Sequence, residues 1–200
     1  DPGIGKSTLL LQAAAHIAKS GCEVVYISGE EAAGQVRLRA ERLGLSDAPI
    51  RLASATSVRD ILTTLGQDTA PAFMVIDSIQ TMHSDQIEGA PGTVSQVRGC
   101  AFELIRYAKD KGLRVNLITN GVKLGDMAFV QGLADAGLDS AQVSIEGGSA
   151  EVHDAITRNP GSWAKATQGV KNLRACGIHA HTNTTICGRN RDHLQELVEF

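Results

Sequence analysis

Apolar runs of strand type alternate with amphipathic stretches of helical period along the whole chain. Val24–Ile27 and Ala72–Ile76 are continuous apolar runs, which are typical of strands buried on both faces of a parallel sheet. We expect strands near Val24, Ile50, Phe73, Leu113, Ala141 and Ile178, with helices between them. This alternation predicts an α/β fold in which parallel strands are joined by right-handed crossovers.

The composition sets limits on size, location and partners. The 200 residues are 42% hydrophobic, which is enough for one good α/β core but hardly for two full domains. No stretch is long and apolar enough for a membrane span, and no signal peptide is visible. Four scattered cysteines fit a reducing cytosol, so we expect a cytoplasmic protein. With 19 Lys and Arg against 22 Asp and Glu, the composition gives no support for tight nucleic-acid binding.

A phosphate-binding loop is indicated at the start of the chain. Gly5, Lys6 and Ser7 fill the last three places of the pattern G-x-x-x-x-G-K-[ST], with Gly3 inside the loop, Thr8 after it, and the first glycine missing. In such loops backbone N–H groups cradle phosphates, the lysine reaches the β- and γ-phosphates, and the hydroxyl binds magnesium. A stretch of helical period follows at once, so the loop lies at a positive helix end.

Acidic residues follow two of the expected strands. Asp77 ends the run Ala72–Ile76, an arrangement by which a strand end presents a carboxylate to magnesium. Glu30 and Glu31 follow the run Val24–Ile27. The alternative is an ordinary strand-end aspartate and a solvated pair of glutamates. We favour a nucleotide site because loop, glutamates and aspartate occur in the required order on the required elements.

The first part of the chain resembles the bacterial RadA family of RecA-like DNA repair ATPases. The resemblance runs from Asp1 to about Lys109, in the segments DPGIGKSTLLLQ, YISGEEAAGQVRLRAERLGL, ATSVRDIL and VIDSIQTMHSDQIEGAPGTVSQVR. It implies that Lys6 and Ser7 hold the phosphates and magnesium of ATP or ADP, and that Asp77 supports the magnesium ion. It also implies that Glu30 or Glu31 polarises the attacking water.

By the same resemblance, Met82 to Thr93 forms a loop that contacts DNA. From its composition the loop is only a mobile one, and Arg98 beyond it fits a surface helix equally well. The sequence as given lacks the family's strand before the phosphate loop, its zinc finger and its carboxy-terminal domain. Without that strand the loop is expected to fray, so we expect weak nucleotide binding and little hydrolysis.

The second part, from about Gly112 to Phe200, resembles the middle of a radical S-adenosylmethionine (SAM) enzyme barrel. The segments LITNGV, GLDSAQVSIEGG and HDAITRNPGSWAKATQGVKNLRACGIHAHTNTTICGRNRDHLQELVEF carry this resemblance. It implies that Ser144, Glu146, Arg158 and Asn183 face the ribose and carboxylate of SAM. For Arg158 and Asn183, a surface ion pair and a strand-end amide are equally good interpretations.

No iron–sulfur cluster is expected from this chain. Radical SAM chemistry needs three thiolates in the pattern CxxxCxxC, and none of Cys22, Cys100, Cys176 and Cys187 has that spacing. SAM cleavage is therefore not expected. His179 and His181 alternate on a strand and share a face, but without a third ligand nearby in sequence an ordinary pair is favoured over a metal site.

These patterns predict a chimera of a RadA-like ATPase part, residues 1–111, and a radical SAM barrel part, residues 112–200. The expected function is ATP or ADP binding by a DNA repair ATPase fragment. The alternatives are a radical SAM fragment without its cluster motif, or an inactive recombinant fusion. Since a strand edge left unpaired in an apolar interface is unfavourable, we expect one continuous parallel sheet with Gly3 to Ser7 near the carboxyl ends of its central strands. The expected order is Ile50, Val24, Phe73, Leu113, Ala141, Ile178.

Overall fold

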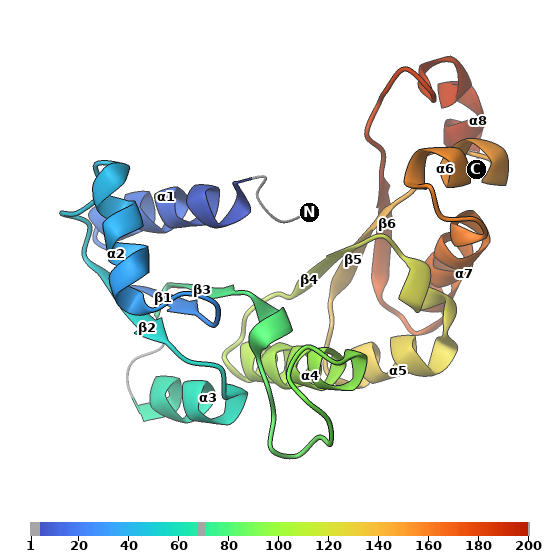
Figure 1. Ribbon diagram of the computed structural model, residues 1–200. Coiled ribbons are helices and arrows are strands. Elements are labelled where there is room, and N and C mark those ends of the chain that lie inside the picture. Colours follow the sequence, from blue (N-terminus) through green and yellow to red (C-terminus); the bar gives the residue numbers. More distant parts are fainter. Residues whose placement is uncertain (1–4, 68–70, 200) are drawn as a thin grey trace. The chain divides into compact units, whose positions relative to one another are not determined.

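The computed structural model describes residues 5–67 and 71–199. They divide into an amino-terminal unit that ends at Leu104 and a carboxy-terminal unit that starts at Ile105 (Figure 1). Each unit contains a three-stranded parallel sheet, so the α/β class is confirmed. The expectation of one core is wrong, because each unit is compact by itself.

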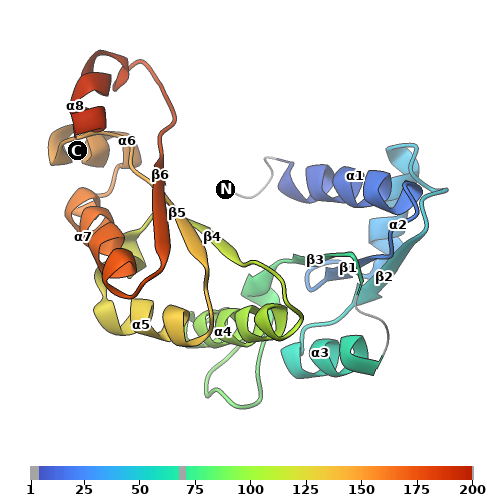
Figure 2. The same ribbon diagram turned by 180° about the vertical axis from the view of Figure 1, so that it is seen from behind.

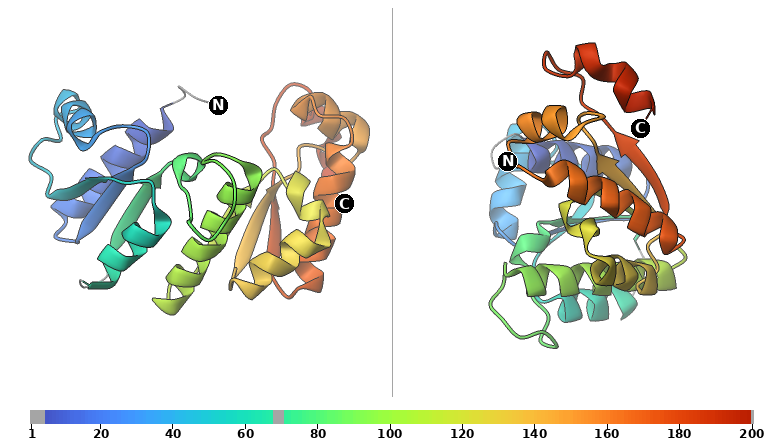
Figure 3. Two further views of the ribbon diagram at one scale, coloured as in Figure 1. Left: turned by 60° about the horizontal axis from the view of Figure 1, so that its bottom comes forward. Right: turned by 90° about the vertical axis from the view of Figure 1, so that its right-hand side faces the viewer.

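The amino-terminal unit has strand order β2-β1-β3, with all strands parallel. Its elements are α1 (Lys6–Lys19), β1 (Val24–Ser28), α2 (Ala33–Arg42), β2 (Ile50–Ser54), α3 (Val58–Gln67), β3 (Phe73–Asp77) and η1 (Ile79–Thr81). Helix α4 (Val94–Asp110) begins in this unit. Within it, α1 and α3 lie on opposite faces of the sheet, an arrangement also visible in Figure 3.

Strand β1 is the centre of this unit because every one of its residues is buried. On one face, Val24 and Tyr26 pack with Leu11 and Ala15 of α1, which are fully buried. Residues four apart share one face of a helix, so the apolar residues that recur at helical spacing in the sequence form the face of α1 that packs on the sheet. The other face of β1 carries Val25 and Ile27, which are also buried.

The carboxy-terminal unit has strand order β4-β5-β6, again all parallel. Its strands are β4 (Asn116–Thr119), β5 (Ser140–Ser144) and β6 (His179–Asn183). Its helices are η2 (Val122–Gly125), α5 (Met127–Asp135), α6 (Ala150–Thr157), α7 (Ser162–Ala175), η3 (Arg191–His193) and α8 (Leu194–Glu199). Within the described ranges, none of the helices combines the length and apolar character that crossing a membrane requires.

One face of this second sheet is apolar and the other is polar. Ala141 and Val143 are fully buried, and α7 packs on β5 and β6 (Figure 2). The chain turns back closely at Gly121, where φ is +76° and an added Cβ would lie 2.6 Å from Cγ1 of Val143. The opposite face carries the alternate residues of the three strands: Asn116, Ile118, Ser140, Gln142, Ser144, His179, His181 and Asn183. Seven of these eight residues are polar, and Ile118 is an exposed apolar residue among them. We call the eight residues the polar sheet face.

The predicted strand order is correct inside each sheet, and the expected pairing of β5 with β4 is present. The prediction of one continuous sheet is wrong, because among the described residues the strands form two separate sheets. A physical reason lies in the side chains. The first sheet is covered by helices on both faces, whereas a joined sheet would carry the polar sheet face into an apolar layer, which is costly without hydrogen-bond partners.

Candidate functional site

The amino-terminal end of α1 is an uncapped helix start. Gly5 precedes it with φ 88°, and the first intrahelical bond runs from the Leu9 N–H to the Gly5 carbonyl at 2.9 Å. Among the described residues no side chain caps this end, and the first turn of the helix contains no acidic residue. The N–H groups of Lys6, Ser7 and Thr8 therefore point out of the helix with the positive end of its dipole. Gly3 lies outside the described residues.

The carboxyl ends of β1 and β3 lie side by side. Ser28 and Asp77 are register partners, and the Gly29 N–H donates to the Asp77 carbonyl at 3.0 Å. The buried Tyr26 hydroxyl donates to Oδ2 of Asp77 at 2.6 Å, which fixes the orientation of this carboxylate. Burial, and then the bond to Asp77, raise the pKa of Tyr26 above its ordinary value, so the hydroxyl stays a donor. Sequence reasoning found Asp77 but missed Tyr26.

Glu30 and Glu31, which the sequence does not distinguish, have different partners. Oε1 of the exposed Glu30 accepts a hydrogen bond of 2.8 Å from the hydroxyl of Ser78, the residue after Asp77. Oε2 of Glu31 instead lies 3.2 Å from Nη2 of Arg39 on α2. The structure thus links Glu30 to the strand end that carries Asp77, and it links Glu31 to a neighbouring helix.

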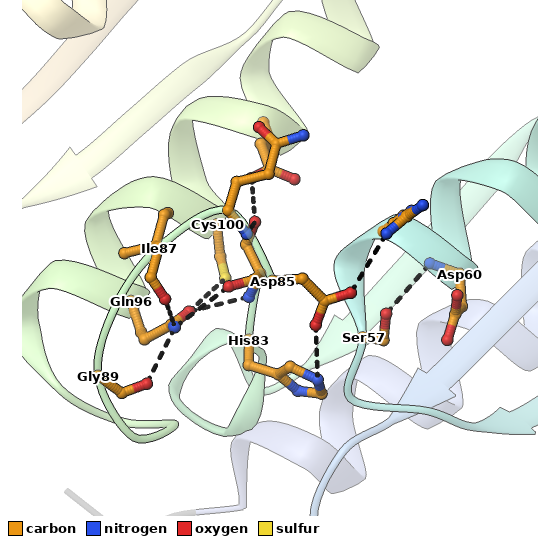
Figure 4. Close-up of polar contacts among 12 residues, drawn as sticks. Ser57, Asp60, His83, Asp85, Ile87, Gly89, Gln96 and Cys100 are labelled. Carbon is orange, nitrogen blue, oxygen red and sulfur yellow. Dashed lines mark hydrogen bonds and ion pairs between the residues drawn. The ribbon is translucent and has the colours of Figure 1, made fainter.

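The segment after η1, residues 82–93, forms a loop that one buried side chain holds in place. Gln96 is 2% exposed, and its amide nitrogen lies 3.2, 2.6 and 3.1 Å from the carbonyl oxygens of Ser84, Ile87 and Gly89 (Figure 4). Its amide oxygen accepts from the Ser84 N–H at 2.8 Å. Gln96 stands in the segment VSQVR, but sequence reasoning singled out only Arg98, which is exposed.

The outer side of this loop is acidic. Asp85 is exposed and lies between His83, at 3.9 Å, and Arg59, at 3.5 Å (Figure 4). Glu88 is also exposed. The loop predicted to contact DNA is therefore ordered through Gln96 and carries negative charge on its surface.

The structure brings together two of the four residues expected to face SAM. Ser144 and Asn183 are register partners at the ends of β5 and β6. Glu146 lies two residues further on, where its Oε2 accepts from the Thr185 N–H at 2.9 Å. Arg158 ends α6 in the left-handed conformation and is exposed, and no contact among the described residues joins it to the other three.

Two buried side chains that sequence reasoning missed support this region. Nδ1 of His153 accepts from the Glu146 N–H at 3.0 Å, and burial lowers the pKa of His153 below its ordinary value. Nδ2 of Asn190 donates to the carbonyls of Glu146 and Thr185, each at 3.0 Å. A neutral histidine and a buried asparagine thus hold the segments after β5 and β6 together.

The four cysteines are free and lie in different parts of the structure. Cys22 is exposed, Cys100 is buried, and Cys176 and Cys187 are partly buried. Burial, and then the charge of Glu103, raise the pKa of the Cys100 thiol, which makes it a poor nucleophile.

Known protein families match both parts of the chain. The family model of the AAA domain matches residues 1–119, and the family model of the radical SAM superfamily matches residues 80–200. The chain belongs to both families. The AAA domain match contains α1, β1 and β3, whereas β5 and β6 lie in the radical SAM match alone. The two matches share residues 80–119, which include the expected boundary between residues 111 and 112.

The chain is also similar to curated DNA repair proteins. It is 50% identical over 132 residues to DNA repair protein RadA of Brucella abortus (strain 2308) and 46% identical over 128 residues to that of Bacillus subtilis (strain 168). Each match covers 64% of this chain, so the likeness is longer than the expected stretch from Asp1 to about Lys109. The chain spans 28% of the length of each of these relatives.

Among solved structures, the chain is similar to the signal recognition particle 54 kDa protein of Aeropyrum pernix K1 in complex with GDP. The similarity covers 99% of this chain and 46% of the other, with 14% sequence identity and a TM-score of 0.35. A TM-score of this size is too low to indicate a shared fold.

Proposed function

We propose that the amino-terminal unit binds magnesium with ATP or ADP, as a fragment of a RadA-type DNA repair ATPase. The observation that carries this proposal is that one compact unit contains both a helix start without a side-chain cap at Gly5 and the oriented carboxylate of Asp77. The relatives named DNA repair protein RadA and the AAA domain match support it.

The residues present fit a magnesium nucleotide. Free N–H groups at a helix start bind phosphate oxygens, and an exposed lysine beside them adds a positive charge. Lys6 and these N–H groups would hold phosphate, with Gly5 allowing close backbone approach and Thr8 completing the first turn. The Ser7 hydroxyl and the Asp77 carboxylate are hard oxygen ligands of the kind that magnesium prefers.

Of the two glutamates, we assign the polarisation of the attacking water to Glu30. Its carboxylate is exposed and tied through Ser78 to the end of β3, where Asp77 lies. Glu31 is paired with Arg39, so its charge is already compensated. Glu31 is therefore the less available of the two glutamates for this role.

Calorimetric titration with magnesium-ADP tests the binding site. Lys6→Ala should lower affinity at least about tenfold, since it removes a charged contact to phosphate. Lys19→Ala is the matched control, because Lys19 lies at the other end of the same helix and pairs with Asp47 at 2.7 Å. Equal binding by wild type and Lys6→Ala would show that the nucleotide site is wrongly placed.

Turnover of magnesium-ATP tests the role of Glu30 separately. We expect wild-type turnover to be low. If Glu30 acts as the base, Glu30→Gln should keep nucleotide affinity and reduce this turnover to the level of Lys6→Ala, whereas Glu31→Gln should change it little. If Glu31→Gln lowered turnover and Glu30→Gln did not, the base would be Glu31. Turnover of wild type no higher than that of Lys6→Ala would refute the hydrolytic step while leaving the binding test unaffected.

A second candidate function concerns the carboxy-terminal unit, and the radical SAM match favours it. We infer that the chain joins the two families within residues 80–119, and that Ser144 and Asn183 bind SAM weakly on the polar sheet face. Glu146 is less available, since its carboxylate already accepts from Thr185, and Arg158 would have to reach the site from α6. Ser144→Ala and Asn183→Ala should each weaken SAM binding in equilibrium dialysis; unchanged binding in both would exclude this site.

A further inference from the structure

Two histidines stand exposed on the polar sheet face. His179 and His181 are alternate residues of β6, so their side chains leave the strand on the same face. Their ring centroids lie 5.9 Å apart, with the ring planes inclined by 37°. The neighbouring strand β5 places Ser140 beside His179 and Gln142 beside His181 in the register.

The spacing of the two rings fits a shared metal ion. Zinc–nitrogen bonds measure about 2.0–2.1 Å, so two imidazoles on one tetrahedral ion have centroids roughly 5 Å apart. The observed separation is less than an ångström larger. Because both side chains are exposed, small rotations of their rings close this difference without repacking a core.

The surroundings of the rings favour a neutral, open site. Gln142 is the register partner of His181 and carries an amide oxygen on the same face, while the Ser140 hydroxyl donates to Oδ1 of Asn116 at 2.9 Å. Within the described ranges, no group of three or more His, Cys, Asp or Glu residues is placed to hold a metal ion. A site here would therefore have two protein nitrogens, with its remaining positions taken by water or another ligand.

We propose that His179 and His181 form a two-imidazole binding site for a divalent transition metal ion, with Gln142 as the adjacent oxygen donor. Imidazole nitrogens suit zinc, copper and nickel, whereas magnesium and calcium prefer oxygen ligands. The site is thus chemically distinct from a magnesium site at Ser7 and Asp77. It does not depend on the nucleotide-binding function proposed above.

Titration of the full chain with zinc chloride, followed by NMR of the histidine ring signals, tests the proposal. The experiment uses a Cys22→Ser background, because Cys22 is an exposed thiol that would compete for zinc. The signals of His179 and His181 should shift together at substoichiometric zinc. His193, a partly exposed histidine that pairs with Glu196 at 2.9 Å, should shift only at higher zinc.

Variants decide whether the two rings act as a pair. Outer-sphere partners alone change metal affinity by about 10–100-fold, so His179→Gln and His181→Gln should each lower zinc affinity by at least about tenfold. The matched control His193→Gln should keep the wild-type affinity. The proposal would be overturned if a variant carrying both His179→Gln and His181→Gln kept the wild-type zinc affinity. It would also be overturned if only one of the two single variants lost zinc affinity.

Discussion

Tyr26 is the residue that most clearly links the core of the amino-terminal unit to its candidate site. Its ring is fully buried against α1, while its hydroxyl donates to the Asp77 carboxylate at 2.6 Å. The strand-end position of Asp77 was predictable from the apolar run before it. Its partner was not, because only the parallel register of β1 and β3, in which Tyr26 lies opposite Val75, brings the Tyr26 hydroxyl within reach of Asp77, two residues further along β3.

Tyr26→Phe should therefore lower the free energy of unfolding of the amino-terminal unit by about 1–2 kcal/mol, since it removes a hydrogen bond to a charged group. The raised pKa means that Tyr26 stabilises the fold fully below the ordinary tyrosine pKa of about 10 and less as the pH rises above it. Chemical denaturation at neutral pH and above pH 10 should show a difference between wild type and variant that shrinks with pH. Tyr107→Phe, in the carboxy-terminal unit, is the control: the Tyr107 hydroxyl is buried without a hydrogen-bond partner among the described residues, so this variant should leave the stability of the amino-terminal unit unchanged.

His153 should make the stability of the carboxy-terminal unit depend on pH in the opposite direction, with stability lost as the pH falls. Because burial lowers its pKa, its contribution to stability is complete above the ordinary value of about 6.5 and is lost as the pH falls through the lowered pKa. His153→Gln, which retains an acceptor for the Glu146 N–H, should make the unfolding free energy of this unit depend less on pH below about 6.5. If the unfolding free energy of the variant, measured by denaturation between about pH 4.5 and 7, depends on pH as steeply as that of wild type, this assignment is contradicted.

At the scale of elements, the loop between η1 and α4 depends on a side chain of α4. Gln96→Leu has a similar size but no amide, so the carbonyls of Ser84, Ile87 and Gly89 lose their donor. We expect residues 84–89 to exchange backbone amide hydrogens at least about tenfold faster, since loss of these bonds costs more than 1 kcal/mol. Gln86→Leu, an exposed position in the same loop, should leave exchange near the wild-type rate. Equal exchange in both variants would mean that Gln96 does not hold the loop.

The end of α6 offers a test of the predicted role of Arg158. Arg158 has φ 54°, a left-handed conformation that costs a side chain about 1 kcal/mol and costs glycine little. Arg158→Gly should therefore raise the thermal stability of the carboxy-terminal unit. If Arg158 also binds SAM, the same variant will lose SAM affinity while gaining stability, which separates a binding role from a structural one.

The boundaries of the elements show where sequence reasoning stops. Five of the six expected strands begin within one residue of their predicted positions, but β4 begins at Asn116 rather than Leu113. The reason is the end of α4. Gly112, with φ 74°, donates to the Lys109 carbonyl, and Leu113 donates to that of Ala108, so Leu113 still belongs to the helix terminus. The apolar run after Gly112 therefore predicted that a strand is present, but it did not predict the residue at which the strand begins.

At the scale of the whole molecule, composition alone did not reveal two cores. The hydrophobic fraction is sufficient for one α/β core, but it does not specify how the apolar residues are divided between parts of the chain. This division depends on which faces of the strands are apolar. The central strand of the first sheet is buried on both faces, whereas the second sheet has one polar face. Only the assembled register shows that the alternate polar residues of β4, β5 and β6 share a surface.

Each core should therefore respond to mutation separately. Leu11 belongs to the core of the amino-terminal unit and Leu173, on α7, to the carboxy-terminal unit, and both are fully buried. Replacing either leucine by alanine should cost about 2–5 kcal/mol in its own unit. Hydrogen exchange should then show Leu11→Ala accelerating amides in β1 with little change in β5, and Leu173→Ala the reverse. A common acceleration of β1 and β5 by either variant would mean that the two sheets unfold as one cooperative structure, because local destabilisation reaches distant amides only through a shared unfolding transition.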